Sequence, residues 1–180
     1  EPKHGHTGLV FGNGKYVGTG YHHRSVLISD DGLNWRYINI KNRNTLRDIE
    51  YGNNLFITVG DGGTILTSNN GTNWHKQESL TKKELKSVVY GNGLFLVVGR
   101  IPGTILYSKN GHNWEKLSNV LVDHRVGPYG GSSITYGNDI FIIVGGGGYM
   151  FYSKDGFSWN YNSNSHGTQD RLLSVKYFKF

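Results

Sequence analysis

Four short phrases of the sequence hold a carboxylate or amide at a fixed distance from serine, glycine and tryptophan. They share the pattern S-x-[DN]-G-x-[NS]-W and occupy residues 29–35, 68–74, 108–114 and 153–159. A carboxylate at the third position could bind a cation or transfer a proton, but two of the four copies carry asparagine there. Asparagine accepts hydrogen bonds from turn amides as well as aspartate does. The pattern therefore predicts structural turns and neither catalysis nor metal binding.

Each member of the phrase, which we call the box, has an expected structural role. The serine hydroxyl bonds locally, the glycine takes a positive φ, and the tryptophan packs between adjacent sheets, where a large ring contributes most. The box residues are Ser29, Asp31, Gly32 and Trp35; Ser68, Asn70, Gly71 and Trp74; Ser108, Asn110, Gly111 and Trp114; and Ser153, Asp155, Gly156 and Trp159.

A second phrase precedes each box by about 20 residues, so the chain is an internal repeat. Its copies start at Phe11 (FGNGKYVGTG), Tyr51 (YGNNLFITVG), Tyr90 (YGNGLFLVVG) and Tyr136 (YGNDIFIIVG). The two phrases recur four times in the same order. They divide the chain into units of about residues 8–46, 47–85, 86–131 and 132–171, with an extra strand at 172–180. We expect one domain spanning residues 1–180.

Each unit is expected to form four short strands. In the third unit these are residues 87–90, 94–99, 104–107 and 114–117, joined by Gly-Asn-Gly and Asn-Gly sequences that supply the positive φ of tight hairpins. The 27 glycines, 12 tyrosines and 18% charged residues also favour strands and turns. Four-stranded units with a period near 40 residues predict an all-β protein, a β-propeller of antiparallel blades.

The two phrases together resemble the Asp-box, or BNR, repeats found in sialidases and in many non-enzymatic secreted propellers. The resemblance covers residues 8 to 177 and is specific for the repeat. It implies no particular activity, because the family uses the same blades in enzymes and in binding proteins. It implies an extracellular or cell-surface location.

The loops that differ between units are expected to carry function. In a four-stranded antiparallel blade, both repeated phrases lie on one face of the disc, and the variable loops lie on the other. Departures from a repeat are where function is usually added to such a scaffold. The candidate ligand-binding residues are Tyr21, His22, His23, Arg24, Asp48, Asp61, Arg100, His124, Arg125, Tyr129, Tyr149 and Tyr161.

Asp48 is a departure on an innermost strand. The alignment of the units puts Gly8, Ser87, Ser133 and Ser174 at its position, and Val10, Val89, Thr135 and Lys176 at that of Glu50. Residues two apart on a strand share a face, so both carboxylates should point the same way. We expect Arg47 or a lysine of a neighbouring blade to neutralise them.

An enzyme is not indicated. The Arg-Ile-Pro sequence at residues 100–102 resembles a sialidase segment, but it lies between the second and third strands of a unit, and no tyrosine–carboxylate pair accompanies it. A glycosidase remains a remote alternative. The consecutive His22 and His23 would point opposite ways on an extended chain, so no metal site is predicted. No cofactor is expected.

Recognition of a ligand is the expected function. Tyrosines, histidines and arginines on the variable face suit a glycan or an anionic cell-surface polymer, and the net charge of +6 favours anionic partners. The alternative is a scaffold that binds a protein partner. The basic residues are scattered, which argues against nucleic acid as a partner, and no apolar run is long enough to span a bilayer. An unpaired strand edge is a liability. The terminal strand is therefore expected to pair with something, and a homo-oligomer formed through it is one option.

Overall fold

The computed structural model describes residues 6–20, 25–99, 104–117, 131–161 and 172–178. Within these residues the chain forms four antiparallel sheets of four strands each, in which neighbours along the chain are neighbours in the sheet. The strands are β1 (His6–Gly12), β2 (Lys15–Gly20), β3 (Ser25–Ser29) and β4 (Arg36–Asn39); β5 (Leu46–Gly52), β6 (Leu55–Gly60), β7 (Thr64–Ser68) and β8 (His75–Gln77); β9 (Leu85–Gly91), β10 (Leu94–Gly99), β11 (Thr104–Ser108) and β12 (Glu115–Lys116); and β13 (Gly131–Gly137), β14 (Ile140–Gly145), β15 (Met150–Ser153) and β16 (Asn160–Tyr161). These sheets are the predicted blades, one for each repeat.

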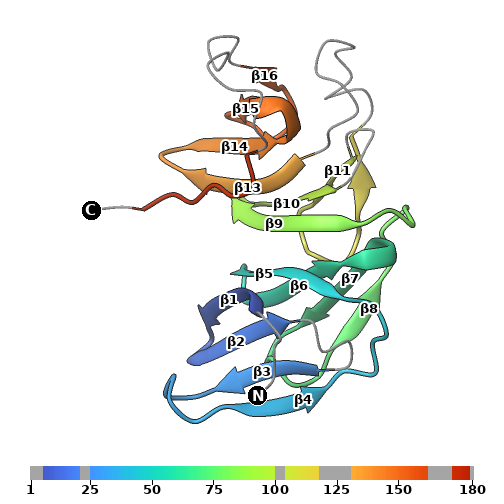
Figure 1. Ribbon diagram of the computed structural model, residues 1–180, viewed down its shortest axis with the longest axis vertical. Coiled ribbons are helices and arrows are strands. Elements are labelled where there is room, and N and C mark those ends of the chain that lie inside the picture. Colours follow the sequence, from blue (N-terminus) through green and yellow to red (C-terminus); the bar gives the residue numbers. More distant parts are fainter. Residues whose placement is uncertain (1–5, 21–24, 100–103, 118–130, 162–171, 179–180) are drawn as a thin grey trace.

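The four blades follow one another in chain order, from β1–β4 at one end to β13–β16 at the other (Figure 1). The first strand of each blade packs against the first strand of the next, so that β1, β5, β9 and β13 line the inner side of the molecule. Two short 3-10 turns, Asp61–Gly63 and Gly146–Gly148, join the second and third strands of the second and fourth blades. In the described part of the chain, no helix has the length and hydrophobicity to cross a membrane.

The tight turns between the first two strands follow from their sequence. Asn13 and Gly14 have φ values of 46° and 70°, and Asn92 and Gly93 of 47° and 73°. Positive φ at both central residues defines the turn that matches the right-handed twist of a hairpin. The repeated Gly-Asn-Gly phrase thereby sets the register in which β1 pairs with β2 and β9 with β10.

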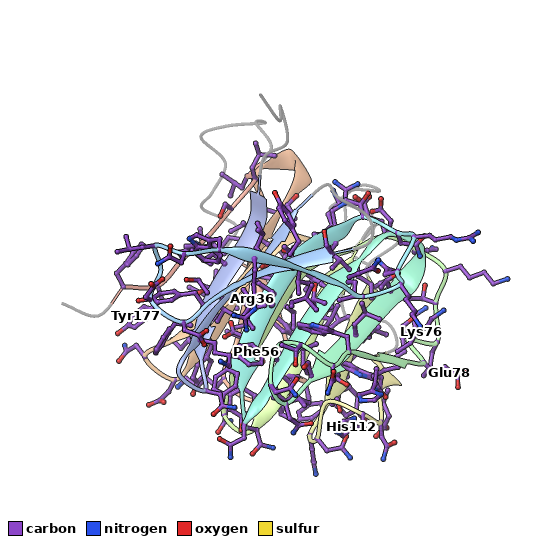
Figure 2. All side chains as sticks on the ribbon, turned by 90° about the horizontal axis from the view of Figure 1, so that it is seen from below. Arg36, Phe56, Lys76, Glu78, His112 and Tyr177 are labelled. Carbon is purple, nitrogen blue, oxygen red and sulfur yellow. The ribbon has the colours of Figure 1, made fainter. Side chains whose placement is uncertain are left out.

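The core lies between blades. Three hydrophobic clusters each join the facing sides of two neighbouring blades. Each cluster contains one fully buried phenylalanine of a second strand: Phe95, Phe141 or Phe56. The buried Phe56 lies in the interior in Figure 2, whereas Lys76 and Glu78 project from one side of the molecule. Stability therefore comes from blade-to-blade packing, as expected for a chain without cysteine.

A glycine on each inner strand makes close packing between blades possible. A Cβ atom at Gly91 would lie 2.2 Å from the ring carbon Cγ of Tyr136 on the next blade, a distance that real atoms do not adopt. Gly12, Gly52 and Gly137 are in the same position relative to Tyr51, Tyr90 and Tyr177. The repeated aromatic-glycine pair is thus a contact between units, with the aromatic residue of one blade lying on the glycine of the blade before it.

The described blades form an open series, and among the described residues the first blade has a neighbouring blade on one side only. Phe11, which corresponds to Tyr51 and Tyr90, is 57% exposed. Trp74, Trp114 and Trp159 pack between blades as predicted, but Trp35 is 39% exposed. The prediction is wrong for Trp35, because a box tryptophan packs against the preceding blade and no described residues form one before β1.

Candidate binding pocket

The boxes are self-contained turns held together by local hydrogen bonds. In the third box, Gly111 N–H donates to Ser108 Oγ at 2.9 Å, and Ser108 Oγ donates to Asn110 Oδ1 at 3.2 Å. The Asn110 oxygen also accepts from the amides of His112 and Asn113, and Trp114 Nε1 donates to Gly111 O. The other three boxes repeat these bonds with Asp or Asn at the third position.

The electrostatics of the boxes agree with a structural role. Hydrogen bonds from the backbone amide and side chain of Asn34 and from the amide of Leu33 hold the pKa of Asp31 well below its usual range. The amides of Ser158 and Phe157 do the same for Asp155. A carboxylate held in the ionised form by turn amides is a poor proton donor or acceptor at neutral pH. The boxes therefore position the strands and leave the chemistry to other residues.

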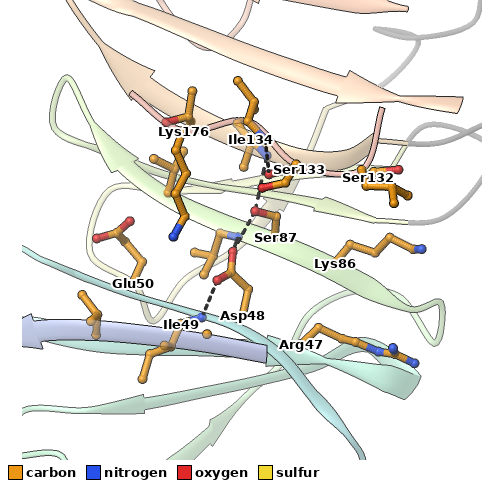
Figure 3. Close-up of a pocket in the computed structure, with 18 of the residues that line it drawn as sticks. Arg47, Asp48, Ile49, Glu50, Lys86, Ser87, Ser132, Ser133, Ile134 and Lys176 are labelled. Atoms are coloured by element: carbon orange, nitrogen blue, oxygen red, sulfur yellow. Dashed lines mark hydrogen bonds between the residues drawn. The ribbon is translucent and has the colours of Figure 1, made fainter. Parts of the chain in front are cut away.

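A cavity of about 530 Å³ lies on the inner side of the blades. Its walls come from β1, β5, β9 and β13 and from residues 172–178, which we call the terminal segment. A volume of this size is typical of ligand-binding sites in proteins. We call this cavity the inner-strand pocket (Figure 3).

Asp48 lies on the wall of the inner-strand pocket and bonds across to the next blade. Its Oδ2 accepts from Ser87 Oγ at 2.7 Å and from the amide of Val88 at 3.0 Å, and its Oδ1 accepts from the amide of Ile49. The same serine hydroxyl accepts from the amide of Ile134 on the following blade at 3.3 Å. Burial nevertheless raises the pKa of Asp48, although these bonds and the charge of Lys176 act in the opposite direction.

Glu50 faces the same cavity with fewer partners. Burial is the largest cause of its raised pKa, which is about 7; the hydrogen bond from the amide of Tyr51 opposes the shift, and the neighbouring charge of Asp48 adds to it. That amide, at 2.9 Å from Oε1, is the hydrogen-bond donor found for Glu50 among the described residues. The carboxyl group can therefore accept or give a proton near neutral pH, and its second oxygen can receive a ligand donor.

Arg47 does not neutralise the two acids as expected. Its guanidinium instead binds Asp61 through two nitrogen–oxygen contacts of 2.8 and 3.2 Å, and it lies 3.3 Å from Glu84 Oε1. Lys86 reaches the same glutamate at 3.9 Å. This network joins the second and third blades at the rim of the pocket. It also gives Asp61, one of the predicted binding residues, a structural role, because its carboxylate pairs with Arg47.

Lys176 of the terminal segment best matches the lysine that was expected to neutralise Asp48 and Glu50. Its side chain points into the inner-strand pocket, toward the side from which Asp48 and Glu50 project (Figure 3). Its charge lowers the pKa of Asp48, but it forms no ion pair within 4 Å among the described residues. The alignment of the repeats places Lys176 at the position equivalent to Glu50, so the sequence already indicated that this lysine faces the carboxylates.

The predicted site residues do not all meet at one place. Asp48 lines the inner-strand pocket, and Asp61 lies at its rim through Arg47. Tyr149 and Tyr161 do not line this pocket; each has its ring near that of Phe151, with centroids 6.5 and 6.4 Å away. The remaining candidates lie outside the described residues: Tyr21, His22, His23, Arg24, Arg100, His124, Arg125 and Tyr129.

In the described ranges no group of three or more His, Asp or Glu side chains is arranged to hold a metal ion. The chemistry of the inner-strand pocket is instead that of two carboxyl groups whose pKa values burial raises, hydroxyls and backbone amides, with lysine and arginine at the edges. Such a lining can bind a polar or basic group by hydrogen bonds and charge.

Sequence comparisons are negative: no protein-family model matches the chain, and no curated protein sequence matches it. Solved structures do resemble it. A streptogramin B lyase has a TM-score of 0.79 at 11% identity, covering 98% of this chain and 60% of the lyase. YCF48 from Cyanidioschyzon merolae has a TM-score of 0.73 at 17% identity, covering 97% of this chain and 60% of YCF48.

Two of the similar structures are complexes. YCF48 bound to D1 peptide has a TM-score of 0.65 at 20% identity, with coverages of 89% and 54%. The nidogen/laminin complex has a TM-score of 0.70 at 13% identity, with coverages of 96% and 68%. At these identities the likeness shows the fold alone, a β-propeller arrangement of blades. The chain spans little more than half the length of the first structures it matches.

Proposed function

We propose that this protein is a binding scaffold for a polypeptide partner, and that the inner-strand pocket receives a basic side chain of that partner. The observation that carries the proposal is the pair of carboxyl groups, Asp48 and Glu50, on the wall of a 530 Å³ cavity. The three other inner strands, β1, β9 and β13, show that the fold does not need them, because glycine, serine, valine or threonine stands at their positions.

Glu50 makes the pocket selective in this proposal. A lysine or arginine side chain would bond its second oxygen and stabilise the ionised carboxylate that burial disfavours. Ligand binding would then lower the pKa of Glu50 and release a proton near pH 7. Lys176 would have to share the pocket with the incoming cation, and its long side chain allows it to move aside.

The comparisons support a polypeptide partner more than the glycan expected from the sequence. Two of the similar structures are a propeller with a bound peptide and a nidogen/laminin complex, although identities of 20% and 13% carry no partner across to this chain. The likeness to a lyase at 11% identity carries no reaction across either. We also propose that the boxes are Asp-box repeats, which the shared hydrogen-bond pattern of the four turns supports.

A glycan is the second candidate, favoured by one observation. Tyr149, Phe151 and Tyr161 form an aromatic group on the fourth blade, and Tyr161 is an exposed part of it. Sugar rings bind to such surfaces through their apolar C–H faces. The two candidates use different residues, so a single comparison of variants separates them.

The test is a pair of arrays followed by two matched variants. The chain is applied to an array of 15-residue peptides of graded charge and to a glycan array, and the best ligand is titrated by calorimetry. We expect basic peptides to bind, with roughly a tenfold loss in Glu50→Gln. Glu78→Gln makes the same chemical change at an exposed residue that does not line the pocket and should bind normally. Binding that Glu50→Gln leaves unchanged, or a response to glycans alone, would overturn the proposal.

A further inference from the structure

Serine hydroxyls join neighbouring inner strands at one position of the repeat. The amide of Ile134 on β13 donates to Ser87 Oγ of β9 at 3.3 Å, and the amide of Val175 in the terminal segment donates to Ser133 Oγ of β13 at 3.3 Å. In both cases the serine is on one strand, and the donor is the amide just after the equivalent residue of the next strand. We call this contact the hydroxyl bridge.

Strand β5 makes the equivalent contact with β9 through a carboxyl group. Asp48 stands at the serine position, and its Oδ2 accepts from the amide of Val88 at 3.0 Å and from Ser87 Oγ at 2.7 Å (Figure 3). This oxygen therefore does for β9 what Ser87 Oγ does for β13. A serine at residue 48 would be enough for the bond to the amide of Val88, so the second oxygen of Asp48 needs a separate explanation.

Strand β1 offers no hydroxyl bridge to β5, because Gly8 stands at the serine position and has no side chain. A Cβ atom at Gly8 would lie 3.0 Å from the amide nitrogen of Ile49, so a hydroxyl carried by this residue could reach that amide. The amide instead donates to Asp48 Oδ1 at 2.9 Å. The same Cβ would lie 3.1 Å from this oxygen, so Oδ1 lies beside the place of the missing side chain.

We propose that Asp48 is a positioning residue of the inner-strand pocket, in which one oxygen replaces the serine of β5 and the other replaces the serine that β1 lacks. The fold needs no carboxylate here, because serine serves on β9 and β13. It needs an acceptor for each amide, since a buried amide without one is costly. Ile49 is 4% exposed, and with Gly8 before it only a side chain with two acceptor atoms satisfies both amides.

Glu50 uses its oxygens differently. Its Oε1 accepts from the amide of Tyr51 at 2.9 Å, and no hydrogen bond to its Oε2 is found among the described residues. Asp48 receives three donors spread over both oxygens. The two acids therefore divide the work: Asp48 holds the pocket wall, and Glu50 is the carboxyl group that meets the ligand. This last assignment rests on the proposed function, whereas the role of Asp48 in the wall does not.

A double-mutant cycle between residues 8 and 48 tests the role in the wall. Asp48→Ser keeps an acceptor for Val88 but removes that of Ile49, and should raise the equilibrium constant for unfolding roughly tenfold. Gly8→Ser alone crowds Asp48 Oδ1 and should also destabilise the chain. The double variant has serine on β1 and β5, as on β9 and β13, and should be more stable than either single variant.

The control is Gly8→Ala combined with Asp48→Ser, which adds the Cβ atom without the hydroxyl and should recover nothing. Urea denaturation measures all five proteins. Losses of Gly8→Ser and Asp48→Ser that simply add would overturn the proposal, and so would an Asp48→Ser variant as stable as the parent. Equal recovery with alanine would also overturn it, because the hydroxyl would then have no part in the effect.

Binding by the double variant tests the division of work, since this variant restores the bonds and removes the charge of Asp48. The probe is a synthetic peptide with one lysine among alanines and serines, titrated by calorimetry. The double variant should bind it within roughly threefold of the parent, whereas Glu50→Gln should lose roughly tenfold. A folded double variant that has lost binding as Glu50→Gln has would show that Asp48 meets the ligand, against the proposal. A peptide that binds none of these proteins, the parent included, would contradict the proposed function, and the stability cycle would still decide the role of Asp48.

Discussion

The first and third blades have the same sequence pattern but different surroundings. The third lies between two others, and its Trp114 is 6% exposed within the cluster that joins it to the second blade. The first has a described neighbour on one side only, and its Trp35 is 39% exposed. Both indole nitrogens donate the same hydrogen bond at 3.0 Å, to Gly111 O and Gly32 O. The box thus forms its turn without a neighbouring blade, and the neighbour determines how much the tryptophan contributes to stability.

Tryptophan replacement should give the largest difference between these two blades. Trp114→Ala removes a buried ring from a packed cluster and should cost about 3–5 kcal/mol of unfolding free energy. Trp35→Ala removes a partly exposed ring and should cost less than about 1 kcal/mol. Urea denaturation of both variants measures the difference. Equal losses would mean that Trp35 is covered in solution as Trp114 is, and would contradict the comparison.

The glycines beneath the tyrosines should give the next largest difference. Gly91→Ala forces Tyr136 away from an enclosed junction and should cost about 3 kcal/mol, near the upper end for overpacking. Gly137→Ala creates the same collision with Tyr177, but the terminal segment can detach and relieve it. We expect global stability to fall by less than about 1 kcal/mol and the Tyr177 amide to lose exchange protection. A large global loss in Gly137→Ala would show that the terminal segment is an integral part of the fold.

The blades should also differ in how pH affects stability. The second blade carries the ionisable Glu50 where the first blade carries Val10. The pKa of Glu50 is about 7 in the folded chain, above the ordinary value near 4.5, so the folded chain holds a proton that the unfolded chain has lost. Unfolding free energy should therefore fall as pH rises from about 4.5 to 7, and stay level above.

The variant Glu50→Gln should remove that slope. It should match the parent near pH 4 and be more stable by about 2 kcal/mol at pH 8, a figure reduced for the partial exposure of the carboxyl group. Glu78→Gln, which alters an exposed residue, is the control and should keep the slope. Urea denaturation at five pH values measures both. An unchanged slope in Glu50→Gln would assign the pH dependence to another group, with Asp48 the first to examine.

The blades were predictable because each is specified by local signals that recur four times. In the third unit, the expected strands at residues 94–99 and 104–107 match β10 and β11 to within one residue. The inner-strand pocket was harder to predict. The alignment placed Asp48 and Glu50 on one face and left Arg47 or a lysine of a neighbouring blade as their partner; of these two options, Arg47 binds Asp61 instead, and the charge of Lys176 acts on Asp48. Arg47 is adjacent in sequence, and adjacent residues of a strand point to opposite faces. Its partner Asp61 lies 14 positions away, beyond any local pattern.

Exchange of Asp and Asn within the boxes should give the smallest effect. Asn110 is exposed although its blade is enclosed, and its oxygen accepts only local amides and the serine hydroxyl. Asn110→Asp keeps every acceptor and should change stability by no more than about 0.5 kcal/mol; Asp31→Asn in the first blade should be equally mild. Ser108→Ala is the contrast, because it leaves the buried amide of Gly111 without its acceptor and should cost about 1–3 kcal/mol. Calcium should not alter the melting temperature of any of these proteins. A calcium-dependent shift of the melting temperature that Asp31→Asn abolishes would show that the box of the first blade holds a cation. That result would separate this box from the two that carry asparagine.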